Sequence, residues 1–119
     1  MKKSRDGRLV VTSQPVPAGT CFYCDVKLIR SVSRKGRDAP PNAWTRDHIY
    51  PRTHKINQTV AGNTVAACAT CNNRKGHLDP LDWLVIMPHQ VGARRLYRRL
   101  LEMGAAVSVL DECMARRKR

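Results

Sequence analysis

Two cysteine pairs constrain what this chain can fold into: Cys21-x-x-Cys24 and Cys68-x-x-Cys71. A Cys-x-x-Cys turn brings two thiolates to one ion, and Zn²⁺ binds four such thiolates tetrahedrally at about 2.3 Å. The pairs lie far apart in the sequence, so one zinc ion would close the base of the long loop between Cys24 and Cys68. Four protein ligands leave no open position on the metal, which predicts a structural role. Redox-active dithiols are the alternative, but neither pair begins a βαβ helix.

The charge balance of the chain indicates a polyanionic partner. Its 119 residues include 22 Lys and Arg against 9 Asp and Glu, which gives a formal net charge of +13. An excess of this size favours nucleic acid as the partner, and a solvated basic surface is the alternative reading. A chain this short buries only a modest core, so a metal staple would add needed stability.

The sequence carries no signal for membrane insertion or secretion. No apolar run approaches the roughly 20 residues that span a bilayer, and the basic N-terminus has no apolar stretch behind it. We therefore expect the protein in the cytoplasm or nucleoid of its host cell. In that reducing setting, paired cysteines bind metal more often than they form disulfides. The fifth cysteine, Cys113, is expected to be a small buried apolar residue or a thiol without a function.

Hydrophobic patterning and turn residues predict an α+β fold, with a small zinc-stapled ββα core followed by C-terminal helices. Trp44 anchors a strand that Pro51 ends, Asp79 and Pro80 suit the start of a helix, and Gly104 suits the end of one. The expected strands are 43–50 and 64–67, and the expected helices are 72–77, 81–87, 90–103 and a last one from 107. The expected parts of the chain are a basic arm at 1–20, a core at 21–88 and a basic helical extension at 89–119.

Several polar residues between the cysteine pairs suit phosphodiester chemistry. His48 has an imidazole whose free pKa, about 6.5, lets it accept a proton from water near neutral pH. Asp47 and Asn72 offer oxygen atoms, which hard cations such as Mg²⁺ prefer. Neighbours on a strand point to opposite faces, so Asp47 and His48 are expected to do different jobs. Taken alone, Asn63 is equally typical of a turn, and Asn72 of a helix cap.

In their order and spacing, these motifs resemble those of the HNH endonucleases. The resembling residues are the two cysteine pairs, Asp47-His48-Ile49-x-Pro51, Asn63 and Cys71-Asn72-x-x-Lys75. The resemblance implies a ββα-metal core in which His48 is the general base and Asp47 and Asn72 bind a divalent cation. It also implies that the Asn63 amide bridges backbone groups in the connecting loop and keeps His48 aimed. Many members have a second histidine in place of Asn72, and its absence favours Mg²⁺ or Mn²⁺ at the catalytic position.

Basic residues near these motifs are expected to hold the nucleic acid. Arg46, Arg74 and Lys75 adjoin the motif residues, where their charges would meet backbone phosphates. The arginine-rich face at 94–99 and the cluster at 116–119 would add affinity that is independent of sequence, and the alternative for each single arginine is a solvated surface residue. We expect DNA in preference to RNA and a monomer or a dimer. The resemblance to small phage-encoded HNH proteins also implies that a packaging or recombination protein could be a partner.

Two other functions fit part of the sequence. A non-catalytic zinc-knuckle module that binds DNA or RNA would explain the cysteines and the charge, but it leaves His48 and its neighbours as coincidence. A phage assembly or packaging accessory protein would use the basic tail to dock a partner. The leading hypothesis is a metal-dependent HNH endonuclease that hydrolyses DNA phosphodiester bonds. Cleavage of DNA with Mg²⁺ or Mn²⁺ distinguishes it from both of these functions.

Overall fold

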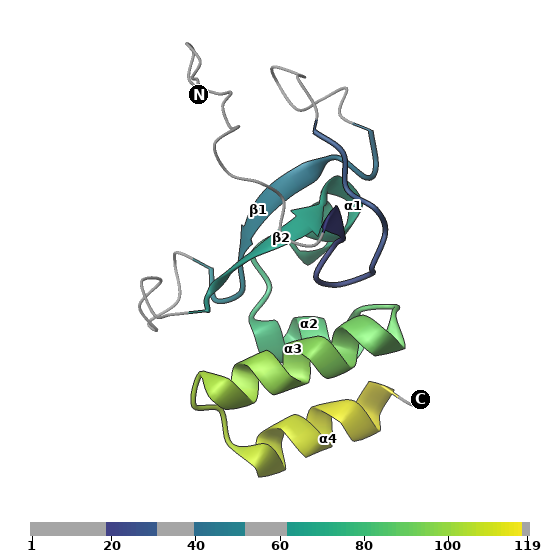
Figure 1. The fold of residues 1–119 in the computed structure, drawn as a ribbon. Coiled ribbons are helices and arrows are strands. Elements are labelled where there is room, and N and C mark those ends of the chain that lie inside the picture. The colour runs from purple at the N-terminus through teal and green to yellow at the C-terminus, as the bar shows by residue number, and fades with distance from the viewer. Residues whose placement is uncertain (1–18, 31–39, 52–61, 118–119) are drawn as a thin grey trace.

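The computed structural model describes residues 19–30, 40–51 and 62–117, which contain a two-stranded sheet and four helices (Figure 1). The expected arm, apart from residues 19 and 20, lies outside the described residues, as do residues 118 and 119 of the basic end. The hairpin and the first helix form one half of the molecule, and the other three helices form the other half. The elements are β1 (Trp44–His48), β2 (Thr64–Cys68), α1 (Ala69–Lys75), α2 (Pro80–Ile86), α3 (Gln90–Glu102) and α4 (Val107–Arg117).

The hairpin pairs β1 with β2 in an antiparallel register. Trp44 lies opposite Cys68 and His48 lies opposite Thr64, so the strand that carries the expected base is tied directly to a cysteine of the second pair. Side chains alternate across a strand, and the last two residues of β1 follow that rule: Asp47 is buried, whereas His48 is partly exposed. The α+β fold with a ββα core is therefore confirmed.

Helix α1 begins three residues earlier than the sequence predicts. The expected helix starts at Asn72, whereas α1 starts at Ala69 with Cys68 as its N-cap. The Cys68 sulfur accepts a hydrogen bond from the Cys71 backbone N–H at 3.3 Å. It therefore caps the helix as a Ser or Asp oxygen does at the start of other helices. The thiolate turn and the first turn of the helix are thus the same piece of chain, and Asn72 lies inside the helix.

The predicted start of α2 is confirmed. Asp79 is the N-cap, its Oδ1 accepts from the Leu81 backbone N–H at 2.8 Å, and Pro80 occupies the first helical position. Helix α4 packs against α2 and α3, and Leu96, Leu100 and Leu110 are fully buried members of the core they share. None of the helices within the described ranges is long and apolar enough to cross a membrane.

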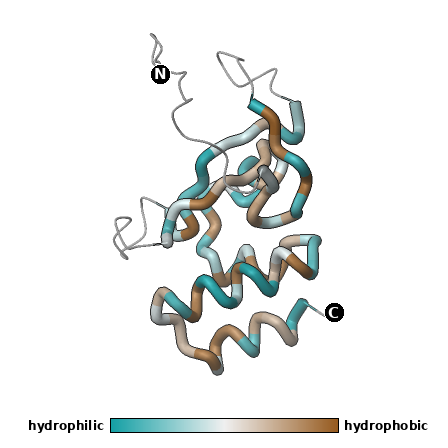
Figure 2. The backbone as a smooth tube through the Cα atoms, in the orientation of Figure 1, coloured by the Kyte–Doolittle hydropathy of each residue, from teal (hydrophilic) through white to brown (hydrophobic). Residues whose placement is uncertain are grey.

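One hydrophobic core joins the hairpin to the helices. Tyr23, between the first two cysteines, packs edge-on against Trp83 of α2 with 5.5 Å between ring centroids. Apolar and polar stretches alternate along α3 in Figure 2, as expected for a helix with one buried side. The core therefore runs across the boundary expected between residues 88 and 89, from Cys21 to Cys113.

Substituting Gly92 is expected to loosen the contact between α3 and the first cysteine turn. A Cβ atom at this position would lie 1.7 Å from the Tyr23 carbonyl oxygen, a backbone atom that has little freedom to move. We expect Gly92→Ala to destabilise the protein by about 1–3 kcal/mol, measured by urea unfolding. Val91→Ala, on an exposed neighbour, is the matched control, and equal midpoints for the two variants would contradict the close approach.

Candidate functional site

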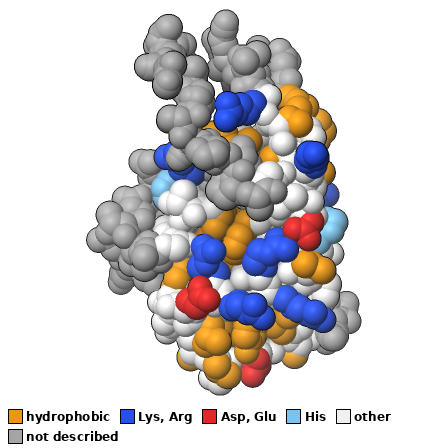
Figure 3. All heavy atoms as spheres, in the orientation of Figure 1, with side chains coloured by type: hydrophobic (Ala, Val, Ile, Leu, Met, Phe, Trp, Pro, Cys, Tyr) orange, Lys and Arg blue, Asp and Glu red, His pale blue; other side chains and the backbone are white. Residues whose placement is uncertain are grey.

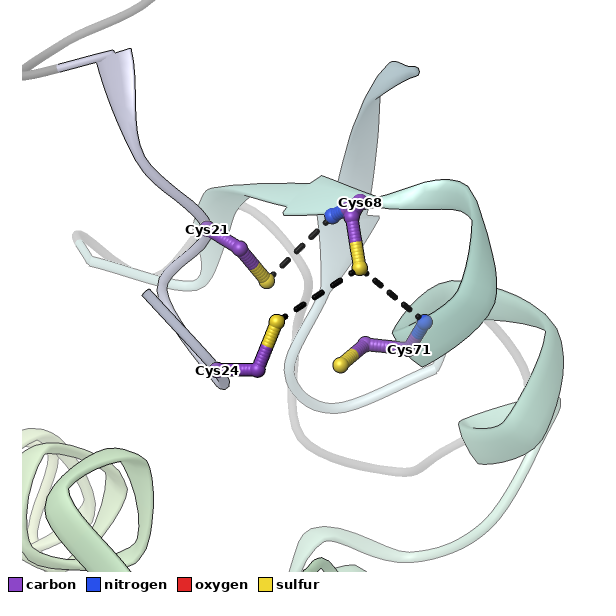
Figure 4. A group of neighbouring side chains, drawn as sticks. All are labelled: Cys21, Cys24, Cys68 and Cys71. Carbon is purple, nitrogen blue, oxygen red and sulfur yellow. Dashed lines mark hydrogen bonds between the residues drawn. The ribbon is translucent and has the colours of Figure 1, made fainter. Parts of the chain in front are cut away.

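The four paired cysteines come together in the structure. Their sulfur atoms all lie within 4.8 Å of one another, and the Cys24 and Cys68 sulfurs are 3.7 Å apart. Cys21 and Cys24 come from the turn before β1, whereas Cys68 ends β2 and Cys71 lies in α1 (Figure 4). Zinc with four sulfurs at 2.3 Å has S···S edges of about 3.8 Å. The cluster therefore fits a zinc ion in both spacing and chemistry.

Backbone amides point at the sulfurs of this cluster. Cys21 Sγ accepts from the backbone N–H groups of Tyr23 and Cys68, both at 3.3 Å. The hydrogen bond from the Cys71 side chain, helped by these amides, lowers the pKa of Cys21 to about 5. The same side-chain bond raises the pKa of Cys71, and burial raises that of Cys24 to about 11. The cluster thus already favours one thiolate, the form in which cysteine binds metal.

The Asp47 side chain of β1 is buried and contacts two polar partners, Tyr23 and Lys75. Its Oδ2 accepts from the Tyr23 hydroxyl at 2.6 Å and lies 3.4 Å from Lys75 Nζ. Burial raises the pKa of the Asp47 carboxyl, while the nearby Lys75 charge acts to lower it. Burial likewise lowers the pKa of the Lys75 ammonium. The result is an ion pair between two buried side chains, with a phenol as third member.

The position of Lys75 differs from the one that the sequence predicts. Its side chain is expected at the surface, next to a phosphate, but the residue is only 1% exposed. Its Nζ also donates to the His48 carbonyl oxygen at 2.9 Å. Lys75 therefore neutralises Asp47 and supports the end of β1 from inside the protein. Arg46 and Arg74 are exposed, and their contacts with phosphate stay a prediction.

Asn63 is fully buried and clamps the backbone just after His48. Its Oδ1 accepts from the Tyr50 N–H at 2.8 Å, and its Nδ2 donates to the Tyr50 carbonyl at 3.2 Å. The Asn63 carbonyl also accepts from the Ile49 N–H at 2.8 Å. The amide thus bridges backbone groups, in the way that the resemblance implies, and it fixes the chain on the C-terminal side of His48.

Asn72 faces β1 from α1. Its Nδ2 donates to Thr45 Oγ1 at 2.9 Å, on the same side of the hairpin as Asp47. Asp47 and Asn72 therefore both lie at the interface of β1 with α1, whereas alternation directs His48 to the opposite face of the strand. The sequence predicts a site role for each of these three residues.

Sequence reasoning missed two partners of these residues. Tyr23 binds Asp47 from within the first Cys-x-x-Cys turn, and no local pattern links positions so far apart. Thr45 binds Asn72, and a local signal for it exists, because Thr45 precedes Asp47 by two residues and so shares its face of the strand.

The arginines of α3 divide into two groups. Arg95 donates to the Phe22 carbonyl at 2.7 Å and pairs with Asp25 at 2.9 Å, and Arg99 donates to the Gly62 carbonyl at 2.7 Å. These two fasten α3 to the hairpin half of the molecule. Arg94 and Arg98 are exposed. Figure 3 shows the Lys and Arg side chains that gather over α3 on the face in view.

Comparison with known proteins agrees with this geometry. The family model that matches is the one described as HNH endonuclease, and it covers residues 21–78. No curated protein and no solved structure matches the chain. The matched range contains all four clustered cysteines, the hairpin and α1. Residues 21–78, just under half of the chain, therefore form an HNH endonuclease domain.

Proposed function

We propose that this protein is a metal-dependent endonuclease that hydrolyses DNA phosphodiester bonds, with His48 as the general base. The observation that carries the proposal is the buried Asn63 amide. It holds the backbone of Tyr50 through two hydrogen bonds, while His48 stays partly exposed two residues earlier. This clamp would keep the His48 imidazole in one position while leaving it open to water and substrate.

Asp47 and Asn72 are the residues that would hold the divalent cation, Mg²⁺ or Mn²⁺. When bound, such an ion supplies positive charge to the phosphate and to the leaving oxygen. Among the contacts of the described residues, Tyr23 and Lys75 both approach Asp47 at Oδ2, so we assign Oδ1 to the cation. Carboxylate and amide oxygens fit either of these ions, which need few protein ligands.

In-line displacement places the attacking water and the leaving oxygen on opposite sides of one phosphorus atom. His48 ends β1, next to Asp47, so a phosphate at this end of the hairpin would have the imidazole on one side and the Asp47 and Asn72 oxygens on the other. We propose that His48 takes the proton of the water, that the oxygen ligands serve the leaving side, and that the products carry 5′-phosphate and 3′-hydroxyl ends.

Exposed arginines would bring DNA to this site. Arg46 lies in β1 next to Asp47, Arg74 lies in α1, and both are exposed. Arg94 and Arg98 extend the basic surface along α3. Contacts of this kind bind phosphate without reading sequence and weaken as salt rises. The zinc ion proposed for the cysteine cluster has no open position and only holds the two halves of the site together.

Replacing His48 tests the proposal. We expect His48→Ala to slow nicking of supercoiled DNA in Mg²⁺ or Mn²⁺ by about 10²–10⁴-fold, the usual contribution of a positioned general base. His89→Ala is the matched control, because His89 is exposed and its side chain makes no cap hydrogen bond. Circular dichroism and zinc content should be unchanged in both. Full nicking by a folded, zinc-loaded His48→Ala variant would refute the assignment.

The Asp47–Lys75 pair favours one other candidate, a non-catalytic zinc-knuckle module that binds nucleic acid. Lys75 already balances the Asp47 charge, so the fold has no electrostatic need for a second metal. This candidate predicts salt-sensitive DNA binding with no cleavage under any divalent ion. Cleavage that needs a phage packaging or recombination protein would instead support the accessory role.

A further inference from the structure

Thr45 connects the two strands to α1 through a single hydroxyl group. Its Oγ1 donates to the Ala67 carbonyl oxygen at 2.8 Å, across the hairpin. The same oxygen accepts from Asn72 Nδ2 at 2.9 Å. Ala67 lies opposite Thr45 in the register and directly precedes Cys68. The Thr45 hydroxyl therefore links the Asn72 side chain to β2, the strand that ends at Cys68 in the cysteine cluster.

The direction of these two bonds decides which way the Asn72 amide faces. A hydroxyl has one proton, and a carbonyl oxygen is able only to accept. The Thr45 proton is therefore committed to Ala67, and Oγ1 has only lone pairs to offer Asn72. An amide meets a lone pair with its NH₂ group, not with its oxygen. The Asn72 Nδ2 is thus held at Thr45, and Oδ1 is turned away from it.

We infer that Thr45 is a positioning residue, which orients Asn72 so that its amide oxygen, and not its NH₂ group, is presented to the catalytic cation. The inference rests on the proposed function, in which Asn72 Oδ1 is a cation ligand. An asparagine amide that rotates freely offers its nitrogen as readily as its oxygen, and only the oxygen binds a hard cation. Residues that orient a metal ligand in this way typically affect metal affinity 10–100-fold.

Substitution of Thr45 tests the inference. Thr45→Val keeps the branched shape and strand preference but removes the hydroxyl, and Thr45→Ser keeps the hydroxyl. With the zinc-loaded full chain, we expect Thr45→Val to weaken Mn²⁺ binding by about 10–100-fold, measured by electron paramagnetic resonance. The Mn²⁺ concentration for half-maximal nicking should rise equally, while the rate at saturating Mn²⁺ stays near that of the unmodified protein. Thr45→Ser should restore both quantities to within about threefold.

Thr70→Val is the matched control for a lost threonine hydroxyl. Thr70 is exposed on α1, and its Oγ1 donates to the Pro41 carbonyl at 3.3 Å. If Thr45 only stabilised the hairpin, both valine variants would alter the unfolding midpoint and neither would alter Mn²⁺ affinity. The inference requires that Thr45→Val alone alters the affinity.

Failure of the inference and failure of the proposed function give different results. If the unmodified protein binds Mn²⁺ and nicks DNA but Thr45→Val binds Mn²⁺ equally well, the inference is wrong and the nuclease proposal stands. If the unmodified protein neither binds Mn²⁺ nor nicks, both are wrong. Should Thr45→Val not fold, Thr45→Ser still decides, because a tenfold loss of Mn²⁺ affinity with the hydroxyl present would contradict the orienting role.

Discussion

Removing zinc with a chelator is expected to unfold the hairpin half of the protein. With zinc bound, the four clustered sulfurs would hold the first turn, the end of β2 and the start of α1 on one ion. Structural zinc contributes about 10–16 kcal/mol in small zinc domains, which is comparable with the whole stability of an ordinary domain, about 5–15 kcal/mol. We therefore expect loss of the cooperative thermal transition on chelation, measured by circular dichroism, and recovery when Zn²⁺ is returned.

Two cysteine variants separate the metal effect from a general effect of losing a thiol. Cys71→Ser should abolish stoichiometric zinc and the transition together. Cys113→Ala should keep both, because Cys113 is buried away from the four clustered sulfurs. A chelated protein that melts at its original temperature would show that the cluster does not hold the fold.

Loss of the Lys75 charge is expected to have the second-largest effect on stability. Lys75→Met keeps the length of the side chain but leaves Asp47 buried beside a phenol, without its cation. Removing one partner of a buried ion pair typically costs about 3–5 kcal/mol, which urea unfolding would measure. Arg74→Met, at the exposed neighbour in α1, is the control and should change stability by less than about 0.5 kcal/mol.

A double variant and the pH dependence of unfolding would show whether an unpaired Asp47 carboxylate causes the stability loss of Lys75→Met. Asp47→Asn together with Lys75→Met removes both charges and should recover most of the loss. Burial already raises the pKa of the Asp47 carboxyl, and without Lys75 that pKa should rise further. The folded form then binds a proton more readily than the unfolded chain does, so Lys75→Met should gain stability as the pH falls toward 4. A loss that is the same at all pH values would rule out an unpaired carboxylate.

Local chemistry explains what the sequence was able to predict. Two Cys-x-x-Cys turns predict one shared metal ion, and the residues around Trp44 and after Asn63 predict two strands. The Asp79-Pro80 pair predicts the start of a helix. Each of these signals lies within a few residues, and the structure confirms the cluster, the hairpin and α2. The start of α1 was predicted three residues too late, because the sulfur atom of Cys68 caps the helix at a position where the sequence predicts only a metal ligand.

Long-range packing explains what the sequence did not predict. The burial of Lys75 depends on Asp47 and Tyr23, which come from two other segments. A retrospective signal exists, because Lys75 follows the buried Cys71 by one helical turn and so shares its inward face. No such signal separates the α3 arginines that bind the hairpin half from those that are exposed. Charge alone does not distinguish Arg95 from Arg94.

The placement of Tyr23 gives one residue of a metal turn unusually little mutational tolerance. The two positions between paired cysteines are ordinarily free to vary, since only the sulfurs touch the ion. Here the Tyr23 ring meets Trp83, its hydroxyl holds Asp47, and its carbonyl lies against Gly92. A shift of the Cys21–Cys24 turn would therefore move the Tyr23 hydroxyl and, with it, Asp47 in β1. Substitutions in this turn and in β1 are expected to affect stability in a coupled way.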